Sequence, residues 1–269
     1  MSAILPTFFL SHGGGPWPWM KDEMPGVFDK LEASLAAIPQ KLSVRPQAIL
    51  IITAHWIERG FAVSGHPKPG MIYDFGGFPA HTYHVKYPAP GSPELARQVE
   101  SMLMSAGFPV GVDMERGLDH GTYTPLVPMF PKADVPVVQL SIDRRFDPET
   151  HLKLGQTLEP LRRQGVLIIG SGLSFHNLGL FGAVAREPSR EFDHWLQETV
   201  AAPPEDRWKR LLRWSSAPSA RRAHPREDHL IPLMVAVGAA EKATSNLVYH
   251  EDEFMGGWCV SSFRFGDCG

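Results

Sequence analysis

Cysteine is scarce in this sequence, since Cys259 and Cys268 are the only two among 269 residues. Both stand near the C-terminus, and neither belongs to a CxxC motif. Small secreted domains are usually dense in disulfides, whereas free thiols are typical of a reducing compartment. The sequence therefore predicts two structural thiols and a cytoplasmic protein.

An excess of positive charge and long apolar runs are also missing. Twenty-six Lys and Arg residues oppose 29 Asp and Glu residues, which leaves a formal net charge of -3. Binding to nucleic acid or to a membrane surface usually needs clustered positive charge, and the one basic stretch, 207–226, is interrupted by Trp and Leu. No run approaches the ~20 apolar residues of a membrane span, and the first ten residues lack the basic start of a signal peptide. We expect a soluble cytoplasmic protein with neither nucleic acid nor membrane as a partner.

Three common catalytic motifs are absent. The glycines at 13–15 are not followed by the Gly-Lys-Ser/Thr of a P-loop. Residues 171–174 do not form the Gly-x-Ser-x-Gly elbow of an α/β-hydrolase. No His-Glu-x-x-His segment appears, which argues against a zincin protease.

Apolar strand patterns alternate with helical patterns along the chain. We expect strands at 7–10, 48–54, 61–64, 135–142 and 166–170, and a hairpin at 247–265 around Gly256 and Gly257. We expect helices at 24–38, 92–107, from Thr124, at 147–163, 190–200 and 206–214, and from His229 with Asp228 as its cap. This order predicts one α/β domain over 1–269, with a largely parallel central sheet, helices on both faces and a C-terminal hairpin.

The placement of the 12 histidines is more informative than their number. His12, His55 and His176 each follow a buried-strand pattern, and the carboxyl ends of parallel strands meet at one edge of a sheet. His120 and His229 stand where helices are expected to begin. A single histidine is more often a structural hydrogen-bonding residue, but three at strand ends favour a divalent transition metal, which neutral imidazoles bind well.

Seven segments, in order and spanning nearly the whole chain, resemble the DOPA-dioxygenase-type branch of the class III (protocatechuate-type) extradiol dioxygenases. The segments are 10–16 (LSHGGGP), 53–56 (TAHW), 73–79 (YDFGGFP), 87–91 (YPAPG), 119–126 (DHGTYTPL), 170–178 (GSGLSFHNL) and 228–233 (DHLIPL). Each motif alone is weak, and the ordered set is specific.

The resemblance implies one non-haem metal site and a catechol-type substrate, similar to DOPA or protocatechuate, whose ring is opened with O2. By position it implies that His12 and His55 bind the metal, with His229 or Glu227 as the third ligand. It implies that His176 is a further ligand or an acid/base group, and that His120 is catalytic on the substrate side. Fe(II) is the expected working metal, and Zn(II) is expected to fit the same site.

The loop at 73–91 is long, aromatic and without periodicity, which is typical of a functional loop. We expect Tyr73, Phe75, Phe78 and Tyr83 to bind the substrate, and His81 and His84 to affect its choice. Trp17 and Trp19 are further candidates for the ring pocket.

Two alternatives remain at this point. The first is a zinc-binding protein on the same scaffold with hydrolytic activity or no oxygenase activity. The second is a metal-binding regulator without catalysis. The oligomeric state is open, with a homo-oligomer as one outcome.

Overall fold

Four apolar strands form the centre of the sheet in the computed structural model, which describes residues 4–268. They are β1 (Thr7–Ser11), β2 (Ala48–Glu58), β5 (Val137–Asp143) and β6 (Val166–Gly172). They run parallel in the order β5-β2-β6-β1, and they are buried almost throughout because helices cover both of their faces. The continuous apolar runs of the sequence thus become the central strands, as predicted.

Shorter or more polar strands complete an eight-stranded sheet within the described residues, in the order β4-β3-β5-β2-β6-β1-β8-β7. The C-terminal hairpin, β7 (Ser245–Phe254) and β8 (Trp258–Phe265), joins the sheet antiparallel to β1. On the other side β3 (Phe61–Ser64) pairs antiparallel with β5 and parallel with β4 (Val110–Asp113). The predicted α/β fold class is confirmed. We did not predict β4, whose half-exposed VGVD sequence carries no strong strand pattern.

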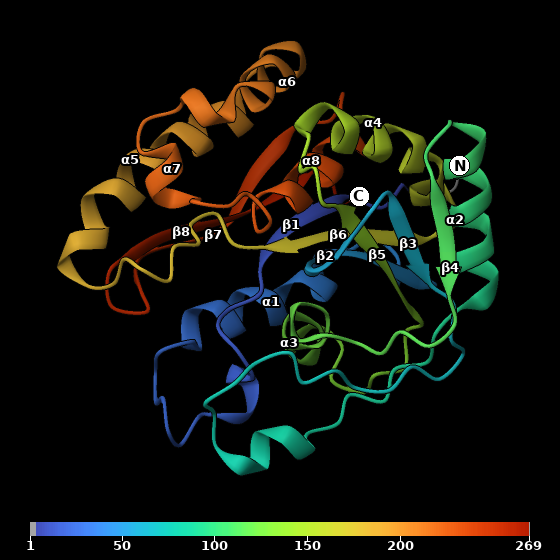
Figure 1. Cartoon of the computed structure of the whole chain (residues 1–269), viewed down its shortest axis with the longest axis horizontal. Coiled ribbons are helices and arrows are strands. Elements are labelled where there is room, and N and C mark those ends of the chain that lie inside the picture. Colours follow the sequence, from blue (N-terminus) through green and yellow to red (C-terminus); the bar gives the residue numbers. More distant parts are fainter. Residues whose placement is uncertain (1–3, 269) are drawn as a thin grey trace.

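Helices lie on both faces of the sheet (Figure 1). The longer ones are α1 (Asp29–Lys41), α2 (Pro93–Ser105), α3 (His120–Met129), α4 (Pro148–Leu158), α5 (Ala183–Ala201), α6 (Pro204–Leu212) and α8 (Ile231–Gly238), and α7 (Ala220–Ala223) is a single turn. On one face α3 packs on β2 and β6 and contacts α1, while on the other α8 packs on β1, β2 and β6 and contacts α4. α5 covers the hairpin. In the described part of the chain, no helix combines the length and the apolar character that crossing a bilayer requires.

Several helix starts differ from the sequence analysis: α1 begins at Asp29 rather than at 24 and α5 at Ala183 rather than at 190, both without a side-chain cap, and capping residues explain two others. Ser92 accepts a hydrogen bond from the Leu95 amide at the start of α2, as predicted. α3 begins at His120 rather than at Thr124, because the Asp119 side chain caps it by accepting from the Thr122 amide. Asp228 does not cap α8, which begins at Ile231, since its carboxylate contacts His229 instead.

His151 ties α4 to the end of β5 in the interior. Its Nδ1 donates to the Asp147 carbonyl at 2.7 Å, and its Nε2 accepts from the Asp143 amide at 3.1 Å. The side chain is fully buried, and this desolvation lowers the pKa of His151 to about 4. Protonation would remove the acceptor at Nε2, so the folded protein needs the neutral ring.

We expect His151→Gln to reduce the loss of stability in acid. The unfolded chain binds a proton at His151 below about pH 6.5, whereas the folded chain does so only near pH 4, so stability falls as the pH drops between these values. Between about pH 7 and pH 5 this residue should cost the wild type about 2 kcal/mol, and glutamine should remove that cost. Urea unfolding at both pH values is the measurement, and exposed His194→Gln is the control. The other buried histidines contribute the same acid loss to both proteins, so an acid loss in His151→Gln equal to that of the wild type would contradict the assignment.

Candidate active site

His12 and His55 come from the two strands that flank β6. His12 follows β1 directly, and its amide donates to the Gly172 carbonyl at the end of β6. His55 lies in β2 beyond its last pair with β6, between Ile52 and Ile57, where the register with β5 shifts. The two ring centroids are 5.0 Å apart, and the two Nε2 atoms are 3.3 Å apart. The parallel sheet therefore delivers two imidazoles to one point on its carboxyl edge.

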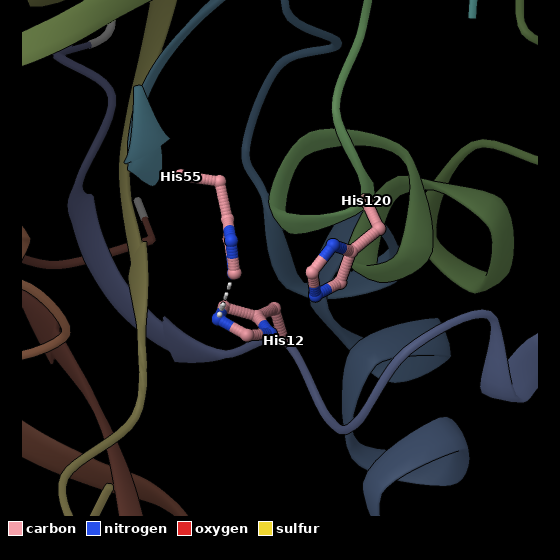
Figure 2. A group of neighbouring side chains, drawn as sticks. All are labelled: His12, His55 and His120. Carbon is pink, nitrogen blue, oxygen red and sulfur yellow. Dashed lines mark hydrogen bonds between the residues drawn. The ribbon is translucent and has the colours of Figure 1, made fainter. Parts of the chain in front are cut away.

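His120 reaches the same point from the start of α3. Its ring centroid lies 3.9 Å from that of His55 and 5.4 Å from that of His12. Figure 2 shows the three rings turned toward one another, and one ligand atom from each lies within 4.8 Å of the other two. Gly121 allows this approach, because a Cβ there would come within 2.7 Å of His55 Cδ2.

His229 and His176 complete a group of five histidines. The ring of His229 lies 5.2 Å from that of His12 and 4.9 Å from that of His55. His176, on the loop after β6, stacks on His229 at 3.4 Å with an interplanar angle of 14°. A second group of ligand atoms within 4.8 Å of one another consists of His176, Asp228 and His229. The structure therefore brings together all five histidines that the sequence analysis assigned to the metal or to catalysis.

Two carboxylates hold three of these rings. Asp74 Oδ2 lies 3.3 Å from His55 Nδ1, and Asp74 Oδ1 accepts from the His120 amide at 2.9 Å. Asp74 Oδ1 also lies 2.9 Å from His120 Nδ1, although the two are not aligned for a hydrogen bond. Asp228 Oδ1 contacts His229 Nδ1 at 3.1 Å. Carboxylates on Nδ1 leave the opposite ring nitrogen free, the arrangement usual for metal-binding histidines.

Burial keeps the cluster neutral. Desolvation, and then repulsion from neighbouring histidines, holds the pKa of His12, His55 and His229 well below 6.5. Desolvation, followed by His120, lowers the pKa of His176 to about 4. For Asp74, burial opposes ionisation, but hydrogen bonds and charge interaction with His120 outweigh it and lower the pKa. These four histidines are thus uncharged nitrogen donors beside the ionised carboxylate of Asp74.

These residues fit a divalent transition metal. His229 Nε2 is buried without a hydrogen-bond partner in the part of the chain that the structure describes, and the Nε2 atoms of His12 and His55 face each other at 3.3 Å. Buried ring nitrogens without a partner cost free energy, which coordination of a cation would recover. Neutral imidazole nitrogens also suit such ions better than they suit Ca²⁺ or Mg²⁺, which prefer oxygen.

A cavity of about 390 Å³ opens beside the histidines. Its polar side consists of His12, His55, Asp74, His120, His176 and His229, and its other side of Met24, Phe75, Phe78, Leu173, Leu178, Met255 and Trp258, with glycines between. Residues 13–15 form part of the wall, where a Cβ on Gly15 would come within 2.3 Å of the Phe78 ring. The size and lining are those of a small-molecule site.

The structure places only half of the predicted substrate residues in this wall. Phe75 and Phe78 line the cavity, whereas Tyr73 and Tyr83 do not. The Tyr73 hydroxyl donates to the Val85 carbonyl, and the Tyr83 ring packs behind Phe75 with centroids 5.3 Å apart. Both tyrosines therefore support the loop rather than face the cavity.

Other candidates from the sequence also lie elsewhere. His81 and His84 are exposed and lie outside the cavity wall. Neither residue can therefore affect the choice of substrate by direct contact, although the sequence analysis predicted an effect on that choice. Trp17 is buried against Phe28 and donates its indole N–H to the His12 carbonyl. Glu227 binds Arg221 through both carboxylate oxygens, at 2.8 and 3.3 Å, and does not line the cavity.

Sequence reasoning assigned no role in the site to Asp74, to the apolar wall from Leu178, Met255 and Trp258, or to Asp228, which it expected only to cap a helix. Asp74 and Asp228 each stand in one of the motif segments, next to an aromatic residue or a histidine. That neighbourhood was the available signal that they belong to the site. Leu178 is only two residues beyond His176. Met255 and Trp258 gave no signal, because only the folding of the hairpin onto β1 brings them here.

Comparison with known proteins agrees with this site. Residues 6–261 match the family described as the catalytic LigB subunit of aromatic ring-opening dioxygenase. A Beta vulgaris protein named 4,5-DOPA dioxygenase extradiol is 39% identical over 269 residues, covering 97% of each chain. Dioxygenase tasH of Hapsidospora irregularis is 38% identical over 94% of this chain and 83% of its own. The crystal structure of an uncharacterised Escherichia coli K12 protein superposes with a TM-score of 0.80 at 29% identity, covering 97% of this chain and 100% of the other.

We expect His229→Ala to lose bound metal and Glu227→Gln to keep it. Alanine at 229 removes a buried donor aimed into the cluster, whereas Glu227 is held away from it by Arg221. Metal content per chain after dialysis, with circular dichroism to check folding, is the measurement. Equal metal content in the two variants would count against His229 as a ligand, and loss in Glu227→Gln alone would assign the third position to the carboxylate.

Proposed function

Because the chain belongs to the family of catalytic LigB subunits of aromatic ring-opening dioxygenases, we propose that it opens a catechol ring at the histidine cluster, with Fe(II) as its working metal. Extradiol ring cleavage is the activity of this family, and the zinc-hydrolase and regulator alternatives give way to it. The observation that carries the proposal is that all five histidines of the cluster line a cavity of about 390 Å³.

We assign His12, His55 and His229 to the metal. Three features support this set: the facing Nε2 atoms of His12 and His55, the unpartnered Nε2 of His229, and the carboxylates that hold Nδ1 of His55 and His229. His176 stacks on His229 at the border of the cavity, and we place it beside the metal ligands rather than among them. When bound, Fe(II) supplies the redox chemistry that lets dioxygen react with a catechol, which Zn(II) cannot supply.

The cavity orients the substrate. A catechol whose hydroxyls point to the histidines places its ring against Phe75 and Phe78, the two aromatic side chains of the 73–91 loop that line the wall. Their rings meet edge to face, with centroids 5.4 Å apart. Holding the ring between packed side chains fixes its orientation relative to the histidines, which is a large part of what a catalytic site provides.

We assign proton transfer to His120 and His176. The Nδ1 side of His120 faces Asp74, so its Nε2 is the atom left to accept a catechol proton and to return it later. His176 borders the same cavity, and its neutral ring can take the second proton-transfer role. The carboxylate of Asp74 stabilises the positive charge that His120 acquires when it takes the proton.

Reconstitution under anaerobic conditions tests the activity. We expect the Fe(II)-loaded protein to consume oxygen with a catechol and to form a yellow ring-opened product, and the Zn(II)-loaded protein to consume almost none. An oxygen electrode and visible absorbance follow the two events over a panel of catechols that includes DOPA and protocatechuate. Absence of oxygen uptake with every catechol would contradict the proposal and return the zinc alternative.

We expect His120→Ala to keep its metal and lose turnover by at least ~100-fold, the usual contribution of an acid/base group. His120→Gln should recover part of the rate if hydrogen bonding is the main role. The measurements are metal content, catechol affinity and kcat. Loss of metal in His120→Ala would show that His120 is a metal ligand, a role that its distance to His55 allows. Near-normal turnover would show that its role is structural.

A further inference from the structure

The cavity wall contains few charged side chains. In the part of the chain that the structure describes, its lining contains no Lys or Arg, and its one carboxylate is Asp74. Both Asp74 oxygens are engaged: Oδ1 by the His120 amide and ring, and Oδ2 by the His55 ring at 3.3 Å. Asp74 therefore holds the rings of His55 and His120 and has no free oxygen for a substituent. Its negative charge repels an anionic group in the cavity.

The basic residues closest in sequence to the wall are committed elsewhere. Lys21, near Met24, binds Glu32 at 2.7 Å. Arg226, near His229, lies 3.8 Å from Asp228 and over the Phe146 ring. No Lys or Arg of the described residues lines the cavity, so a carboxylate buried against its wall would have no cationic partner there, and burying an unpaired charge is costly.

Part of the cavity wall is apolar and reaches the surface. Leu178, Met255 and Trp258 line it, and Phe181 stacks on Trp258 with centroids 4.9 Å apart. Leu178 is 66% exposed and Phe181 44%, so these side chains present apolar surface to solvent at this end. A substituent that covers such surface gains hydrophobic free energy.

From this division we propose that the substrate is a catechol whose ring substituent is neutral and apolar, an alkyl or aryl group, rather than one with a carboxylate or an amino-acid side chain. This inference rests on the proposed function for the catechol itself and adds the class of its substituent. The catechol hydroxyls face the histidines, and the substituent lies along Leu178, Met255 and Trp258. The same arrangement ranks ligands: catechols with a neutral apolar substituent bind more tightly than those with a charged one.

Binding to the Zn(II)-loaded protein tests the ranking without turnover. Isothermal titration calorimetry compares 4-propylcatechol with 3-(3,4-dihydroxyphenyl)propionate, which has the same number of substituent carbons, and with dopamine and DOPA. We expect 4-propylcatechol to bind at least ~10-fold more tightly than the propionate. Along catechol, 4-methyl-, 4-ethyl- and 4-propylcatechol, affinity should rise about threefold for each methylene that is buried. Equal or tighter binding of the propionate or of DOPA would overturn the inference.

A charge placed at the rim should reverse the preference. Leu178→Lys puts a cation beside the substituent, and its affinity ratio for the propionate over 4-propylcatechol should rise by at least ~10-fold. Val184→Lys is the matched control, because Val184 is 63% exposed and outside the cavity wall, and its ratio should stay as in the wild type. If Leu178→Lys fails to fold by circular dichroism, Met255→Lys replaces it. An unchanged ratio in the folded rim variant would overturn the placement of the substituent.

Oxygen uptake by the Fe(II)-loaded protein with the same compounds separates the two claims. If no catechol is consumed, the proposed function fails, while the binding series still decides the substituent class. If the carboxylated catechols are consumed with the higher kcat/KM, the dioxygenase function stands and the inference fails.

Discussion

The crowding of neutral imidazoles at one edge of the sheet is the constraint on which the rest of the site depends. His12 and His55 bring their Nε2 atoms to 3.3 Å, and His229 adds a buried Nε2 without a partner. Burial removes the water that would solvate these nitrogens, and mutual repulsion prevents them from all becoming protonated. Coordination of a cation would offset both costs.

That arrangement requires supports outside the cluster. Asp74 from the 73–91 loop holds His55 and His120 together, and Asp228 holds His229 from the adjacent position. Gly121 keeps α3 close enough to β2 for His120 to reach the cluster. The loop thus has two roles, because the same stretch supplies the carboxylate under the histidines and, at Phe75 and Phe78, part of the cavity wall.

The cavity combines parts of the chain that lie far apart in sequence. His12, His55 and His120 come from strand ends and a helix start, where backbone geometry is rigid, whereas the apolar wall comes from the 73–91 loop, the loop after β6 and the C-terminal hairpin. Rigid elements suit the residues that need fixed geometry. Loops and hairpin turns suit the residues that contact a variable substituent, since they change most readily without disturbing the sheet.

The sequence by itself determined the architecture and the chemistry of this protein. Continuous apolar runs specified the buried parallel strands, because such strands are covered on both faces, and the histidines at their ends specified the site. The ordered motifs identified the dioxygenase family. Tertiary structure alone decided the rest: that His229 rather than Glu227 faces the cluster, that Tyr73 and Tyr83 lie behind the wall, and that Met255 and Trp258 complete it. These depend on side-chain direction and on the pairing of the C-terminal hairpin with β1, contacts between residues more than 200 positions apart that local patterns cannot encode.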